Sequence, residues 1–170
     1  MSDLPGVDDA ALQQTVIRAA EARDVPAVIA LIRALAEFEK LPGPDEAAAE
    51  RFAADFHERR FQLLVADTRG TVIGYALYFF TYSTFLAQAS LYLEDLFVEP
   101  AARGRGIGER FMRRLAAEAV QQRCGRFEWT VLDWNVQAQK FYRGLGAELL
   151  DDWRVCRVTG AALTRLASTR

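Results

Sequence analysis

The chain has few cysteines, a single histidine and no long apolar run, and each shortage excludes a class of protein. Its 170 residues include two cysteines and one histidine. Two cysteines are too few for a disulfide scaffold, which indicates a cytoplasmic location. No run approaches the roughly 18 apolar residues that span a bilayer, and the start lacks the basic and apolar parts of a signal peptide. We therefore expect no membrane partner and interpret residues 1–14 as a flexible N-terminal leader.

The chain also lacks net positive charge, with a formal value of −2, which argues against nucleic acid as a partner. The charge is unevenly distributed. Residues 1–58 carry twelve acidic and five basic side chains, whereas residues 59–170 carry eleven acidic and sixteen basic ones. One interpretation is uneven surface decoration. The other is a cationic ligand met partly by the first part and an anionic ligand met by the second.

Hydrophobic spacing predicts one mixed α/β domain over residues 15–170, with a mostly antiparallel central sheet flanked by helices. Helices are expected at 24–38, 45–59, 106–122 and 135–144, the last capped by Asn135. Strands are expected at 15–18, 61–66, 72–81, 89–98 and 127–132, followed by a last pair that begins at Gly146 and ends with 153–158. The helix over 106–122 has one apolar face, formed by Ile107, Phe111, Met112, Leu115 and Ala119.

A turn rich in arginine and glycine joins the strand that ends at Val98 to the helix that begins at Gly106. Its glycines lack Cβ atoms, so an anion can approach the backbone N–H groups at the helix start. The turn lacks the Lys-Ser/Thr pair of a nucleotide P-loop and the βαβ context of a dinucleotide site. It indicates a site for a phosphate-bearing carrier; the alternative is an ordinary solvated, basic helix start.

The turn Arg103-Gly104-Arg105-Gly106-Ile107-Gly108 resembles the acyl-coenzyme A turn of the GCN5-related N-acetyltransferases (the GNAT family), Arg/Gln-x-x-Gly-x-Gly/Ala. The likeness covers roughly residues 15–160 and implies a single-domain GNAT fold, acetyl-coenzyme A (acetyl-CoA) as co-substrate and a homodimer. Five further segments resemble the spermidine/spermine and thialysine N-acetyltransferase branch: Phe80-Thr81-Tyr82, Leu91-Tyr92-Leu93-Glu94-Asp95, Trp134-Asn135, Phe141-Tyr142 and Trp153-Arg154.

The resemblance also implies which residues contact acetyl-CoA and which one acts as general acid. Tyr142 would protonate the departing thiolate, a role that suits a phenol with a pKa of about 10; the alternative is a tyrosine packed in the core. The implied acetyl-CoA contacts are a strand segment that pairs with pantetheine, the turn around the pyrophosphate, and one asparagine: Leu96, Phe97, Val98, Arg103, Gly104, Arg105, Gly106, Ile107, Gly108 and Asn135.

Two adjacent carboxylates precede the turn. A protonated amine must lose a proton before it attacks a thioester, and a carboxylate can bind the ammonium and then accept that proton. We expect Glu94 to be the base and Asp95 to contact or support the substrate. Adjacent strand residues face opposite sides, so both reach one site only across a bulge, which the resemblance implies. The alternative is that one of them pairs with a neighbouring arginine.

Phe38, Glu39 and Trp153 are the remaining candidates for substrate contact. The resemblance implies that Phe38 and Glu39 line the amine groove and that Trp153 forms a wall of it. The alternatives are an ordinary helix end for the first two and a core position for Trp153. Ser83 departs from the polyamine branch, where an acid follows Phe-Thr-Tyr, so a shorter amine or amino acid remains open as substrate.

These residues together predict an acetyl-CoA-dependent N-acetyltransferase that acts on a small cationic amine by direct attack in a ternary complex. No His/Cys/Asp spacing indicates a metal site, and neither cysteine has a histidine partner for nucleophilic catalysis. Two alternatives remain. The acceptor can be a protein N-terminus or lysine, or the chain can be a non-catalytic acyl-CoA-binding regulatory module.

Overall fold

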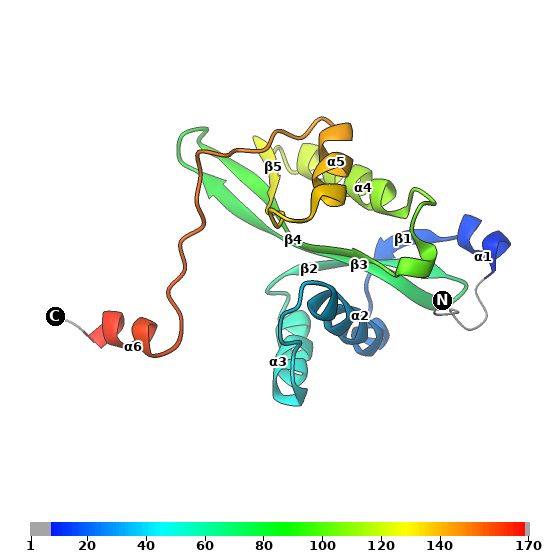
Figure 1. Ribbon diagram of the computed structural model, residues 1–170, viewed down its shortest axis with the longest axis horizontal. Helices are drawn as coiled ribbons and strands as arrows, with labels where there is room; N and C mark the ends of the chain where they lie inside the picture. Colours follow the sequence, from blue (N-terminus) through cyan, green and yellow to red (C-terminus); the bar gives the residue numbers. More distant parts are fainter. Residues whose placement is uncertain (1–7, 169–170) are drawn as a thin grey trace. The chain divides into compact units, whose positions relative to one another are not determined.

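A five-stranded sheet organises the first part of the chain. The computed structural model describes residues 8–168, which form two compact units that meet in the sequence at Thr130 and Val131 (Figure 1). The first unit contains α1 (Asp9–Gln13), β1 (Val16–Ala19), η1 (Ala22–Asp24), α2 (Val25–Phe38), α3 (Glu46–His57), β2 (Gln62–Thr68), β3 (Thr71–Ser83), β4 (Gln88–Val98), η2 (Pro100–Ala102), α4 (Ile107–Gln121) and β5 (Arg126–Trp129). The second contains α5 (Val136–Gly144) and α6 (Gly160–Ser168).

The strand order is β1-β2-β3-β4-β5, and the first four strands pair antiparallel with one another in that order. β5 pairs with β4 in parallel, and that pairing covers Ser90 to Leu93 of β4. The mixed, mostly antiparallel sheet predicted from the sequence is therefore confirmed. Among the described residues no strand pairs with β4 on the β5 side beyond Leu93, so Leu96–Val98 has no strand beside it there, and the Val98 carbonyl oxygen accepts from the Arg103 side chain.

Helices cover both faces of this sheet, with α2 and α3 on one face and α4 on the other (Figure 1). The apolar face predicted for α4 is confirmed, since its five residues are all buried. On the opposite face, α2 packs on the three central strands through one buried cluster. Its members are Val28, Leu31, Leu63, Val65, Tyr75, Leu77 and Phe97.

A network of ion pairs joins β1, β2 and the residue before α2. Arg18 on β1 pairs with Asp24 at 2.6 Å and with Asp67 on β2 at 2.8 Å. The Arg18 guanidinium lowers the pKa of Asp24. Asp24 immediately precedes α2, but its carboxylate accepts from Arg18 and from the Glu21 N–H rather than from the N–H groups of the helix.

Two expectations from the sequence differ from the structure. The predicted final pair of strands is wrong, because residues 147–159 form neither helix nor strand and α6 follows them. A strand needs a hydrogen-bonded neighbour, and the described residues of the second unit contain no strand with which these residues could pair. Within the expected leader, residues 9–13 form α1, with Ala11 and Leu12 buried; residues 1–7 lie outside the described part. Among the described helices, none is long and apolar enough to cross a membrane.

Candidate active site

A β-bulge in β4 lies opposite the junction of Leu77 and Tyr78 in β3. Leu77 pairs with Asp95 and Tyr78 pairs with Leu93, so Glu94 is the extra residue. Phe79 and Leu77 both face α2, and their partners on β4 are Tyr92 and Asp95. Tyr92 and Asp95 are three residues apart and share a face only because of the bulge. By the same alternation Glu94, two residues after Tyr92, faces α2 as well.

Two neighbouring acids, Glu94 and Glu39, act on Asp95 at this face of the sheet. Burial, and then the charge of Glu94, raise the pKa of Asp95 to about 6, with a smaller contribution from Glu39. Glu39 follows the last residue of α2, and its own pKa is raised by burial. Glu94 is the exposed member. A carboxyl whose ionisation is opposed by burial and by neighbouring acids is suited to binding an ammonium ion, whose positive charge would favour the ionised form.

Tyr75 donates a hydrogen bond to Asp95, at an O···O distance of 3.3 Å. Its ring belongs to the buried cluster under α2 and its side chain is fully buried. Burial raises the pKa of this phenol, so the hydroxyl keeps its proton and acts as donor. The sequence reasoning missed Tyr75, because its position in an apolar strand is typical of a core residue and carries no separate signal.

The glycine-rich turn has the backbone geometry that its predicted role in anion binding requires. Gly104 has a φ of +78° and Gly106 a φ of +74°, a conformation that favours glycine, and a Cβ at either would meet open space. Gly106 caps α4 without a side-chain hydrogen bond to its first N–H groups. Four N–H groups at a helix start need outside partners, so this turn fits the pyrophosphate of a coenzyme A thioester.

The arginines of this region have protein partners. Arg105 pairs with Asp9 of α1, Arg110 donates to the Thr15 carbonyl oxygen, and Arg113 pairs with Glu109 at 2.7 Å. A cavity lined by Asp9, Leu12, Gln13, Arg105 and Arg110 lies between α1 and the start of α4. An anion at the turn would therefore be held chiefly by backbone N–H groups, with these cations contributing at longer range.

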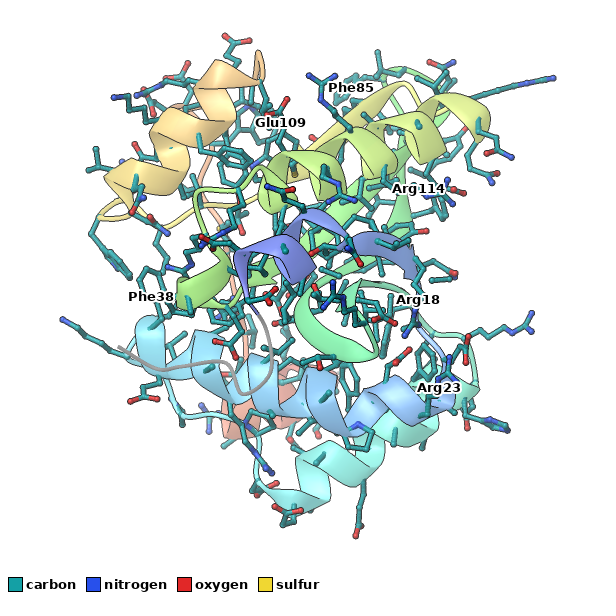
Figure 2. The ribbon with its side chains drawn as sticks, turned by 90° about the vertical axis from the view of Figure 1, so that its right-hand side faces the viewer. Arg18, Arg23, Phe38, Phe85, Glu109 and Arg114 are labelled. Atoms are coloured by element: carbon teal, nitrogen blue, oxygen red, sulfur yellow. The ribbon has the colours of Figure 1, made fainter. Side chains whose placement is uncertain are left out.

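Arg103 connects the turn to the C-terminal end of α2. Its Nε donates to the Val98 carbonyl oxygen at 2.8 Å. Its guanidinium carbon lies 5.4 Å from the centre of the Phe38 ring and 5.3 Å from that of Phe97, a cation–π arrangement on two rings. Phe38 lies at the end of α2 away from Arg18 and Arg23 (Figure 2). Arg103 therefore contacts both Phe38, which is predicted to bind the amine, and Val98, which is predicted to contact acetyl-CoA.

The second unit carries the other predicted residues. Asn135 caps α5 as predicted, with its side chain accepting from the Ala138 N–H at 3.1 Å. Tyr142 lies on α5 with its ring centre 5.2 Å from that of Phe141, and burial raises the pKa of Tyr142 to about 12. Trp153 is exposed rather than in a core. Tyr142 is thus a phenol that stays protonated at neutral pH.

Burial raises the pKa of the Cys124 thiol, which opposes formation of a thiolate. Between residues 8 and 168, no group of three His, Cys, Asp or Glu side chains is placed to hold a metal ion.

The fold is that of known acetyltransferases, and sequence comparison places the chain among them. The family model described as "Acetyltransferase (GNAT) family" matches residues 25–147. The chain therefore belongs to the GNAT family and is an N-acetyltransferase. It is 38% identical over 165 residues to the thialysine N-epsilon-acetyltransferase of Bos taurus, which covers 89% of this chain and 96% of that one.

Two further relatives extend this comparison. The chain is 44% identical over 92 residues to the L-ornithine N5-acetyltransferase of Arabidopsis thaliana, covering 54% of this chain and 40% of that protein. Among solved structures, an integron cassette protein from the mobile metagenome of V. cholerae superposes with a TM-score of 0.75 at 28% identity, over 91% of this chain and 98% of that one.

Proposed function

We propose that the protein transfers the acetyl group of acetyl-CoA to a primary amine of a small cationic substrate of the thialysine type. The observation that carries the proposal is the order of three features along β4 and the turn after it. Glu94 and Asp95, with Glu39 of α2 near them, come first. The strand edge of Leu96–Val98 follows, and then the glycine turn before α4. Acid side chains fit the ammonium, the strand edge fits pantetheine, and the turn fits the pyrophosphate.

The mechanism is direct attack within a ternary complex. Asp95 and Glu39 bind the ammonium, and Glu94 accepts its proton, directly or through water. The amine nitrogen then forms a bond to the acetyl carbon while the carbon–sulfur bond breaks, and N–H groups of β4 polarise the thioester carbonyl. Tyr142 donates its proton to the departing thiolate. Phe38 lies at the amine groove, and for Trp153 and Asn135 we propose the roles that the resemblance implies, in binding the amine and acetyl-CoA respectively.

Ser83 favours a short amine over a long polyamine. Its side chain is buried, and its Oγ accepts from the Leu86 N–H at 3.3 Å. Where the polyamine branch places a carboxylate, this position is a neutral group used within a turn. Two relatives, named for thialysine and ornithine, act on amino acids with a terminal side-chain amine, which supports the same class here.

We also propose a homodimer in a reducing compartment such as the cytoplasm. The segment after α5 exposes apolar side chains, including Trp153, Val155 and Leu166. Such exposure is unfavourable in an isolated chain. The resemblance implies that a second copy of the chain covers these side chains. The two cysteines, both free thiols, fit a reducing compartment.

The test is release of free coenzyme A from acetyl-CoA across a panel of amines. The panel contains thialysine, ornithine, lysine, diamines, polyamines and peptides with a free N-terminus or a lysine. We expect the highest kcat/KM with thialysine or ornithine. A preference for the peptides would contradict the small-molecule assignment, and turnover with none of them would favour a non-catalytic acyl-CoA-binding module.

A further inference from the structure

Tyr75 occupies the most consequential position that the proposed mechanism leaves unused. It pairs with Phe97 on β4, two residues from Asp95 and on the same face. Its ring is part of the core under α2, where a phenylalanine would pack as well. The hydroxyl is therefore not needed for packing, and it donates to the Asp95 carboxylate at 3.3 Å.

The charged groups around Asp95 oppose its ionisation. Glu94 lies beside it on β4 and Glu39 follows α2, and both raise the pKa of Asp95, as does burial. The Tyr75 hydroxyl acts in the other direction, because it donates to the carboxylate. The bond is longer than the usual 2.7–2.8 Å for O–H···O, so its effect should be moderate.

We propose that Tyr75 is a positioning residue, whose hydroxyl orients Asp95 and favours its ionised form, so that Asp95 binds the ammonium of the substrate near neutral pH. This inference rests on the proposed function, because it assigns a role to Asp95 in amine binding. It adds a residue from the core of the sheet to the determinants of amine affinity. It also makes that affinity dependent on pH in a range where amines themselves stay protonated.

The test compares Tyr75→Phe with the wild-type enzyme, using thialysine as the probe and saturating acetyl-CoA between pH 5 and 9. Loss of the donor raises the pKa of Asp95. As the pH is lowered, KM for thialysine should therefore begin to rise at a pH about 0.5 to 1 unit higher than in the wild type. At pH 5, below the pKa of Asp95 in both proteins, we expect KM to be about 3- to 10-fold higher than in the wild type, with little change in kcat. Tyr78→Phe is the matched control, since it removes a hydroxyl from the same strand on the face toward α4.

Two further measurements separate positioning from a general structural role. Titration of the Asp95 carboxyl carbon by NMR should show its pKa raised in Tyr75→Phe and unchanged in Tyr78→Phe. In an Asp95→Asn background, adding Tyr75→Phe should leave the pH dependence of KM unaltered.

The outcomes distinguish this inference from the proposed function. An active enzyme whose KM profile and Asp95 titration are the same in Tyr75→Phe and wild type would overturn the inference alone. A uniform loss of kcat at every pH, shared with Tyr78→Phe, would also overturn it. A wild-type protein that acetylates no amine would overturn the proposed function and the inference with it.

Discussion

At the scale of single residues, Asp95 combines an unfavourable position for folding with a favourable one for binding a cation. Its carboxyl is held among Glu39, Glu94 and apolar neighbours, and its pKa is raised to about 6. The folded state therefore binds more protons than the unfolded chain between about pH 4 and 6. The free energy of unfolding therefore falls as the pH rises through this range, and the full destabilisation by ionised Asp95 is present above it.

Replacement of Asp95 by Asn should therefore stabilise the protein while it weakens function. The amide has a similar shape without the charge, so we expect the melting temperature at pH 8 to rise by several degrees. At pH 4, where the carboxyl is protonated in the folded state, the gain should vanish. Thermal unfolding at the two pH values measures this, and a gain that is equal at both would contradict the account of Asp95.

Tyr142 is expected to act in the chemical step rather than in binding. A phenol that burial keeps protonated can supply a proton to a developing thiolate. Tyr142→Phe should lower kcat by about 100-fold or more, while acetyl-CoA affinity measured by calorimetry stays within about twofold of the wild type. Unchanged turnover would eliminate the general-acid role.

At the scale of elements, the glycine turn and α4 act together, since the turn leaves the first N–H groups of the helix without a side-chain partner. Gly106→Ala introduces a Cβ at positive φ and into the space where an anion would approach. We expect acetyl-CoA affinity to fall about 10-fold or more. Calorimetric titration with acetyl-CoA measures the loss.

Gly70→Ala is the control for this turn. Gly70 has a φ of +86° and, like Gly106, open space at its Cβ position, but it lies between β2 and β3. Both substitutions should lower stability by a similar amount of about 1 kcal/mol. Only Gly106→Ala should weaken acetyl-CoA binding; an equal loss in both would mean that backbone strain, not anion binding at the turn, is responsible.

The helices and the mostly antiparallel sheet were predictable from local signals, whereas the exact register of β4 on β3 and the fate of the last predicted strands were not. The periodic apolar residues of α4 and the cap at Asn135 are local features, and both predictions are confirmed. The position of Asp95 depends on one extra residue in β4 relative to β3, which no periodicity in either strand reveals. Residues 153–158 have a strand-like composition, but a strand forms only where a neighbour accepts its hydrogen bonds.

At the scale of the whole molecule, the proposed dimer makes the apolar segment after α5 an interface. We expect light scattering to give twice the 19.1 kDa mass of the chain. Val155→Asp places a charge among these exposed apolar side chains and should shift the protein toward the monomer without lowering the stability of the first unit. Val120→Asp, on an exposed position of α4, is the control, and a wild-type protein that is monomeric would contradict the proposal.

In the proposed reaction, acetyl-CoA donates an acetyl group to a small amine at the carboxylates of β4. The most direct measurement is NMR of a reaction that contains acetyl-CoA labelled with ¹³C in the acetyl group and thialysine, with the wild-type enzyme and with Glu94→Gln. The account predicts a labelled N-acetyl signal on the side-chain amine that forms at least about 100-fold more slowly in Glu94→Gln. Formation of labelled acetate alone, or an equal rate in the two proteins, would contradict it.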